Sequence, residues 1–265
     1  MHPFYLVNAF STEPFGGNPA AVLPLEGLEW PATGWMQGVA AQFNLAETAF
    51  ALLQPDGSYG LRWLTPVAEV DLCGHATLAT AHTLWQTGAL ATDAEARFDT
   101  RSGRLTCRRL ADGRIAMDFP ALPVRPVPTP ELALRALGIP SAPALTDGTY
   151  LVLELPDEDA VRAVTPDMAL LSQLEAWGTI ITARASGTTD FVSRFFAPRK
   201  GVPEDPVTGS AHCRLAPYWA AKLGKGTLQA RQVSSRGGEL SLELTGDRVR
   251  IMGRAVTVGH GDLQI

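Results

Sequence analysis

Hydrophobic and polar positions alternate along this chain with two periods. A period of about two residues is typical of strands, and a period of about 3.6 residues is typical of helices. Apolar residues alternate on both sides of the turns at 111–113 and 245–247. The pattern therefore predicts two β-hairpins, over 105–119 and 240–252. These hairpins occupy matching places near the ends of the two halves of the chain.

Each half also contains one long helical pattern with an apolar stripe. The patterns begin beside Gly74 and Gly209, and Gly88 and Gly224 end them. Pro217 lies inside the second pattern, where it is tolerated in the first turns and otherwise kinks a helix. Weaker helical patterns cover 34–42, 130–137 and 166–177. We predict an α+β fold in which a curved, mostly antiparallel sheet surrounds one central helix in each half.

The two halves are related by an internal repeat. Three segments recur in the same order at nearly one offset: 62–66 as 194–198, 74–77 as 209–212, and 103–107 as 238–242. A period near 134 residues is too long for a solenoid repeat. The repeat indicates two pseudo-symmetric domains that face each other, with a cleft between them in which a small ligand would bind.

A proline-rich segment marks the boundary between the predicted domains. Five prolines fall within eleven residues, at Pro120, Pro123, Pro126, Pro128 and Pro130. This density favours an extended connector over a helix or a central strand. We predict an N-terminal domain over 1–119, a linker over 120–129 and a C-terminal domain over 130–265, and leave open whether the last strand returns to the first domain.

Composition restricts the partners of the protein. The chain has 265 residues, 46% of them hydrophobic, and a net charge of −5, which leaves no basic surface for nucleic acid or an acidic membrane. Cys73, Cys107 and Cys213 are odd in number and far apart, which argues against a disulfide framework and a zinc site. With no signal-like segment and no long apolar run, we expect a cytoplasmic protein.

The two long helices supply the first candidate site. A helix start carries unpaired amides and a partial positive charge, so it binds carboxylates without basic side chains. The starts at Gly74–His75 and Gly209–Ser210 would both point into the predicted cleft. For either glycine alone, a tight turn between strand and helix explains the position better. The duplication favours a binding site for a small carboxylate-bearing molecule.

Glu47 is the candidate base, because it is the only ionisable residue in the apolar segment 44–53. Partial burial would raise the pKa of its carboxyl group and suit it to proton transfer near neutral pH. A solvated carboxylate or a turn cap explains the position equally well. His75 could act as an acid or orient a substrate, and Asp205 could set its tautomer. The ordinary alternative for His75 is a local hydrogen bond at the helix start, and for Asp205 it is a turn before a proline.

Cys73 is a second candidate for the chemistry, since a helix start lowers the pKa of a thiol. Its repeat-related counterpart lies near 205–206, where no cysteine occurs, so a symmetric two-thiol mechanism has no support. Motifs for nucleotide cofactors and for serine hydrolysis are absent. Spacing suitable for a metal cluster is lacking among His2, His82, His212 and His260. We therefore expect neither a metal nor a cofactor.

Five segments spanning nearly the whole chain carry a further signal: NAF at 8–10, GGNPA at 16–20, NLAETAF at 44–50, LCGHAT at 72–77 and EDPVTGSAH at 204–212. In this order they resemble the phenazine-biosynthesis PhzF-like family. The resemblance implies the fold shared with diaminopimelate epimerase, in which two similar domains each wrap a sheet round a central helix. It also implies a homodimer.

The same resemblance implies roles for individual residues. Proton transfer would belong to Glu47, assisted by His75 and Asp205, and the substrate site would be lined by Gly74, Gly209 and Ser210. Cys73 keeps the cysteine of related epimerases, whereas Ala46 stands where some members carry serine. The implied activity is that of a cofactor-independent isomerase that moves a proton beside a conjugated carboxylic acid.

Three functions therefore compete. The first is the isomerase, supported by Glu47 and the paired helix starts. The second is an amino-acid racemase or epimerase that uses Cys73, supported by the position of that thiol. The third is a binding protein that kept the cleft without catalysis.

Overall fold

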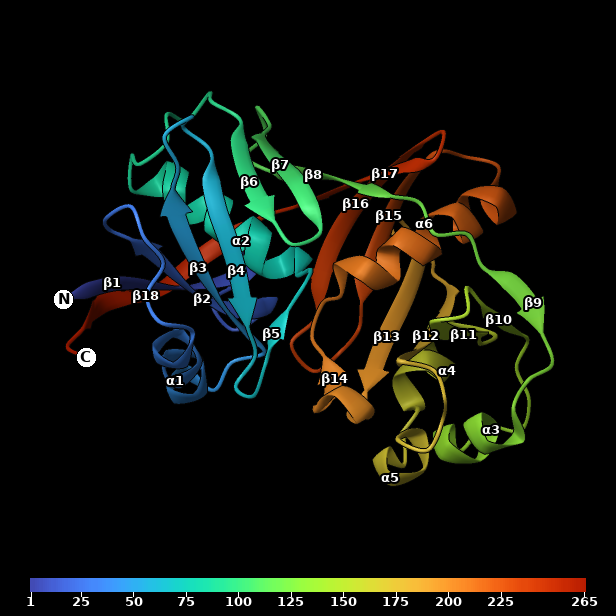
Figure 1. Cartoon of the computed structure of the whole chain (residues 1–265). Coiled ribbons are helices and arrows are strands. Elements are labelled where there is room, and N and C mark those ends of the chain that lie inside the picture. The colour runs from blue at the N-terminus through green and yellow to red at the C-terminus, as the bar shows by residue number, and fades with distance from the viewer. The chain divides into compact units, whose positions relative to one another are not determined.

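The computed structural model describes residues 1–265, which divide into two compact units. The first unit consists of Met1–Asp118 and Met252–Ile265, and the second of Phe119–Ile251. In each unit a curved, open sheet lies around one long helix, α2 in the first and α6 in the second (Figure 1). The predicted α+β fold is confirmed. None of the helices is both long enough and sufficiently apolar to span a lipid bilayer.

The sheet of the first unit uses strands from both ends of the chain. Its strands, in order across the sheet, are β18 (Ala255–Leu263), β1 (His2–Ala9), β2 (Asn18–Leu25), β3 (Glu47–Leu53), β4 (Tyr59–Leu64), β6 (Ala96–Thr100), β7 (Gly103–Arg109) and β8 (Ile115–Pro120). Neighbours are antiparallel except for the parallel pairs β2–β3 and β4–β6. The short strand β5 (Glu69–Val70) pairs with β4. The last strand of the chain therefore belongs to the first unit.

Each parallel pair needs a crossover connection, and a helix supplies it. Helix α1 (Thr33–Phe43) connects β2 to β3, and α2 (Gly74–Gln86) lies between β5 and β6. Ten of the thirteen residues of α2 are buried, and the helix contacts β1, β2, β3 and β18. Its buried threonines are satisfied internally, since the Thr77 and Thr80 hydroxyls donate to carbonyls four residues back at 2.6 and 2.7 Å.

The two faces of this sheet carry different side chains. Leu23, Phe50 and Leu64 pack on one face against Met36 of α1. Alternate residues of a strand point to the opposite face, which is where α2 lies. On that face β3 carries small alanines, and its first residue, Glu47, shares their orientation. The pleat of β3 therefore directs Glu47 toward the central helix.

The second unit repeats this topology. Its strands, in order, are β9 (Arg125–Val127), β10 (Ala144–Thr146), β11 (Tyr150–Glu154), β12 (Gly178–Arg184), β13 (Phe191–Ala197), β15 (Thr227–Gln232) and β16 (Gly238–Thr245), and β17 (Arg248–Gly253) follows. The pairs β11–β12 and β13–β15 are parallel, as β2–β3 and β4–β6 are. Strand β14 (Val202–Asp205) pairs with β13 as β5 pairs with β4.

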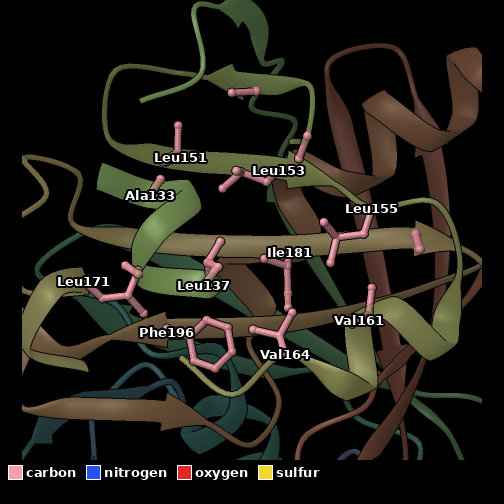
Figure 2. Close-up of a cluster of buried hydrophobic side chains, with 14 of the residues drawn as sticks. Ala133, Leu137, Leu151, Leu153, Leu155, Val161, Val164, Leu171, Ile181 and Phe196 are labelled. Atoms are coloured by element: carbon pink, nitrogen blue, oxygen red, sulfur yellow. The ribbon is translucent and has the colours of Figure 1, made fainter. Parts of the chain in front are cut away.

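Short helices cover the outer face of the second sheet. They are α3 (Glu131–Leu137), α4 (Glu158–Ala163) and α5 (Met168–Leu171), and the central helix is α6 (Gly209–Leu223). Figure 2 shows Leu137, Val161 and Leu171 of these short helices pointing toward Ile181 of β12 and Phe196 of β13. Burial of this cluster holds the short helices on the sheet.

Several predicted elements appear as expected. The hairpin over 105–119 forms from β7 and β8, with Cys107 opposite Met117. Strands β16 and β17 occupy the second predicted hairpin, where Arg250 contacts Glu243 at 2.9 Å. The helical patterns over 34–42 and 130–137 correspond to α1 and α3.

Two predictions differ from the structure. The pattern over 166–177 forms only the four-residue helix α5, because Asp167 caps its start and the chain turns directly after Ser172. The proline-rich segment is not a plain connector, since β9 pairs antiparallel with β10. Pro126 is tolerated there because β9 is an edge strand, where a missing N–H breaks no internal ladder.

A matched pair of glycine substitutions tests the packing at the start of β12. A Cβ atom on Gly178 would lie 2.4 Å from two ring carbons of Phe195, so Gly178→Ala should destabilise the protein by about 1–3 kcal/mol. Gly38 in α1 is exposed with nothing within 4 Å of such a Cβ atom. Gly38→Ala should stabilise by about 0.5–1 kcal/mol. Urea unfolding measures both, and equal midpoints would contradict the packing at Gly178.

Candidate active site

Four polar side chains gather at the start of α2 in the first unit. Asn18 begins β2, Glu47 begins β3, Cys73 is the N-cap residue of α2, and His75 lies in its first turn. Because β2 and β3 are parallel neighbours, both strands start at the same end of the sheet. The predicted residues Glu47, Cys73 and His75 are thus brought together within one unit.

His75 is the centre of this cluster. Its Nδ1 lies 3.1 Å from Asn18 Nδ2, and its Nε2 lies 3.3 Å from Glu47 Oε2. Cys73 Sγ is 3.5 Å from His75 Nδ1. The amide of Asn18 donates to Nδ1, so the ring proton sits on Nε2 and is donated to the carboxylate. This arrangement fixes both the ring orientation and the tautomer.

Burial makes the imidazole neutral. The His75 side chain is 6% exposed and the Glu47 side chain 16%. Desolvation lowers the pKa of His75 to about 3, because the surrounding protein solvates the imidazolium poorly. The Glu47 carboxylate therefore receives a hydrogen bond but no full positive charge from its neighbour. It remains a poorly hydrated acceptor, which suits proton abstraction.

The starts of the two central helices lack side-chain caps. Neither Cys73 nor Thr208 makes a capping hydrogen bond, and neither helix has an acidic residue in its first turn. By contrast, Asp157 and Asp167 cap α4 and α5. Uncapped amides at a helix start are well suited to a ligand carboxylate. The starts of α1 and α3 lack a side-chain cap as well, so what distinguishes α2 and α6 is that they combine an uncapped start with a central, buried position.

In the second unit, the predicted residues Asp205, Gly209 and Ser210 lie together at the start of α6. The Thr208 hydroxyl donates to Asp205 Oδ2 at 2.5 Å. Ser210 Oγ lies 3.2 Å from the Tyr150 hydroxyl. Tyr150 opens β11 and was not singled out from the sequence, since an isolated tyrosine at a strand start carries no distinctive pattern.

Gln232 is another residue that the sequence pattern did not reveal. It is fully buried, accepts from the Thr208 amide at 2.9 Å and donates to the Asp205 carbonyl at 2.6 Å. It therefore fixes the segment that leads into α6. The alternation of residues in this segment places Gln232 on the inward face of β15 with Leu228 and Ala230. A glutamine on a buried face needs buried hydrogen-bond partners, and this could have pointed to its role.

A duplicated ion pair holds the strand before each central helix. Arg62 of β4 contacts both carboxylate oxygens of Glu69 in β5, each at 2.7 Å. Arg194 of β13 contacts both oxygens of Glu204 in β14 at 2.8 and 3.0 Å. Both arginines open repeated segments of the sequence. Such bidentate pairs have a defined geometry, so they orient the chain that enters α2 and α6.

The duplication does not extend to the base. Glu47 pairs with Ala20 across β2–β3, and the corresponding pair in the second unit is Gly178 with Tyr150. The Phe195 ring fills the space in which a side chain at 178 would lie. The counterpart of Glu47 is therefore a glycine, and only the first unit carries a carboxylate at this position.

The remaining predicted residues are also placed. The counterpart of Cys73 is the N-cap residue Thr208, just beyond the positions 205–206 inferred from the repeat. Ala46 directly precedes β3, is half-buried, and offers only a methyl group. Sequence spacing indicated no metal cluster, yet ligand atoms of Glu47, Cys73 and His75 lie within 4.8 Å of one another.

The buried histidines predict a dependence of stability on pH. Burial lowers the pKa of His75 to about 3 and that of His212 to about 4, from an ordinary value of 6.5. Between these values the unfolded chain binds protons that the folded chain does not. Stability should therefore fall as pH falls from about 6.5, by up to about 1.4 kcal/mol per pH unit for each histidine.

Urea unfolding between about pH 7 and 4.5 measures this slope. His212→Gln should make the slope shallower, whereas the control His260→Gln, on an exposed residue, should leave it unchanged. An identical slope in all three proteins would show that His212 is not held neutral by burial.

Sequence comparison relates the chain to known proteins over almost its full length. The family described as phenazine biosynthesis-like protein matches residues 7–261. An uncharacterized isomerase from Pseudomonas aeruginosa is 49% identical over 263 residues, covering 98% of each chain. An uncharacterized isomerase from Halalkalibacterium halodurans is 43% identical over 266 residues, again covering 98% of each chain.

Solved structures agree with this relationship. A PhzF family protein from Enterococcus faecalis has a TM-score of 0.94 at 41% identity, covering 100% of this chain and 99% of that one. A probable proline racemase from Agrobacterium radiobacter shares the fold alone, with a TM-score of 0.67 at 13% identity, covering 100% and 93% of the respective chains. The relatives named as isomerases support an isomerase function, and the racemase shows only that the fold is shared.

Proposed function

Because the chain belongs to the phenazine biosynthesis-like family, we propose that it is a cofactor-independent isomerase acting on a small, conjugated carboxylic acid. Glu47 is the general base. The observation that carries this proposal is the Glu47 carboxylate, 84% shielded from solvent and 3.3 Å from a neutral His75, beside the uncapped start of α2. Relatives named as isomerases support the reaction class.

The first step is binding of the substrate carboxylate. The amides of Gly74 and His75 at the start of α2 donate hydrogen bonds to it, and the positive end of the helix dipole favours an anion there. A glycine at this position lets the ligand approach the backbone closely. Glu47 then removes a proton from a carbon atom conjugated with the bound carboxylate. The helix start stabilises the negative charge that develops on the substrate.

In the second step Glu47 returns the proton to another carbon of the conjugated system. No atom is gained or lost, so the reaction needs neither an oxidant nor a second substrate. His75 donates a hydrogen bond from Nε2–H to the carboxylate and keeps the base aligned, while the imidazole itself stays neutral. Cys73 and Ala46 line the substrate site beside this base.

We extend the proposal to the second unit, where Gly209 and Ser210 bind a further polar group of the substrate. Asp205 assists the proton transfer. Support comes from the repeat, which gives α6 the same uncapped start as α2, and from Gln232 and Thr208, which hold Asp205 in one conformation. We further propose a cytoplasmic homodimer, as the family resemblance implies.

Substitution of the base tests the reaction directly. Glu47→Gln keeps size and hydrogen bonding but cannot accept the proton, so solvent exchange into substrate should fall by at least about 100-fold. The measurement is mass spectrometry of candidate carboxylic acids after incubation with the enzyme in deuterated water. Glu26→Gln, on an exposed residue of the same unit, is the control and should exchange at the wild-type rate.

Exchange that survives Glu47→Gln would remove Glu47 as the base. Ligand binding in calorimetry, with no exchange for any bound acid even in the wild-type protein, would instead indicate a binding protein.

A second candidate is an amino-acid racemase or epimerase, because Cys73 Sγ lies 3.5 Å from His75 Nδ1 and could act as a base. Cys73→Ser separates the two functions. The isomerase predicts reduced but measurable exchange in this variant and loss in Glu47→Gln. The racemase predicts loss in Cys73→Ser together with deuterium at the α-carbon of an amino acid.

A further inference from the structure

We infer that Glu47, Cys73 and His75 form a binding site for one thiophilic divalent cation such as Zn²⁺, and that the bound cation blocks the isomerase reaction. These residues supply a carboxylate oxygen, a sulfur atom and an imidazole nitrogen, which is a donor set that zinc prefers. All three belong to the first unit. Cation binding is thus independent of the reaction, whereas the blocking effect rests on the proposed function.

The spacing of the donor atoms fits a tetrahedral ion. Bonds of about 2.0–2.3 Å to a tetrahedral zinc place neighbouring donors about 3.3–3.7 Å apart. His75 Nε2 lies 3.3 Å from Glu47 Oε2 and 4.0 Å from Cys73 Sγ. All three ligand atoms lie within 4.8 Å of one another. Cys73 Sγ lies 3.5 Å from Nδ1, beside the ring, so the Cys73 and His75 side chains must rotate to bring the sulfur atom and the Nε2 lone pair to a common point.

Asn18 completes the surroundings of the imidazole. To bind the ion, His75 must free Nε2 and carry its proton on Nδ1 instead. Asn18 lies 3.1 Å from Nδ1, and rotation of its amide offers the carbonyl oxygen as acceptor. A ligand histidine in a metal site normally donates its other N–H in this way. The Cys73 thiol releases one proton to solvent, so each cation bound displaces one proton.

The site has three protein ligands, which leaves the fourth position to water or to a substrate carboxylate. An open position and partial solvent access make such an ion removable by chelators. The bound cation occupies the carboxylate that would receive the substrate proton, and it occupies Nε2 of His75, which in the reaction donates a proton to that carboxylate. Coordination and proton transfer therefore exclude each other.

Only one such site exists in each chain. The counterparts of the ligands in the second unit are Gly178, Thr208 and Ser210, which supply no carboxylate, thiolate or imidazole. Cys107 and Cys213 are buried away from this arrangement, and burial raises the pKa of Cys213 to about 12. We therefore expect one cation per chain.

Cobalt(II) is the probe, because its thiolate complexes absorb in the near ultraviolet and its tetrahedral complexes absorb strongly in the visible. Full-length protein freed of metal with a chelator is titrated with Co²⁺ at neutral pH. We expect both bands to saturate at one equivalent, and Zn²⁺ to bleach them. Cys73→Ser should lose the thiolate band, while Cys213→Ser and Cys107→Ser should retain it.

Two further variants test the rest of the geometry. His75→Gln should lose the tetrahedral bands, and Asn18→Ala should weaken binding by about 10- to 100-fold. Serine is itself a good N-cap residue, so Cys73→Ser should keep the fold, which circular dichroism verifies. Absence of the thiolate band at one equivalent, or its persistence in Cys73→Ser, would overturn the site.

The exchange assay tests the blocking effect separately. Zn²⁺ should abolish deuterium exchange over the same concentration range in which it bleaches the cobalt bands, and a chelator should restore exchange. Full exchange by the zinc-loaded enzyme would overturn the blocking effect and keep the site. Loss of the proposed isomerase function would show instead as no exchange in the metal-free protein, with the spectra unaffected.

Discussion

The burial of a whole helix inside a curved sheet is the constraint on which the rest of this molecule depends. Most residues of α2 have no access to water, so its side chains must be apolar or, like Thr77 and Thr80, bonded to their own helix. Such a helix offers few positions to polar groups of other elements, and its start is one of them. The position of the chemistry at the start of α2 follows from this burial.

The same constraint explains what the two units share and where they differ. Both keep the bidentate arginine–glutamate pair, the uncapped helix start and the succession of strand directions, because these features define the wrapped helix. Neither Glu47 nor Cys73 is needed for that architecture. Their counterparts, Gly178 and Thr208, were free to become a packing surface for Phe195 and a partner for Asp205.

Much of the fold could be predicted from the sequence because the repeat, the glycines and the apolar periods are local signals. Helices α2 and α6 begin at Gly74 and Gly209 and end just before Gly88 and Gly224, as the sequence pattern predicted. Glu47 was recognisable as the only carboxylate in an apolar segment. Residues whose roles depend on strand register were given no role from the sequence, although Asn18 lies in the GGNPA segment and Gln232 on an inward strand face. Asn18, Tyr150 and Gln232 reach their partners only after distant segments come together, so the sequence does not identify those partners.

The strand that closes the first unit has a consequence for the newly made chain. Residues 255–263 pair with β1, and Thr257 lies 3.2 Å from His82 of α2, so the sheet of this unit lacks its edge strand until residues 255–263 have been made. The second unit is one continuous stretch, 119–251, so it needs no segment made after residue 251. The unit that carries the base is thus complete only after the whole of the second unit has been made, although most of its sequence comes first.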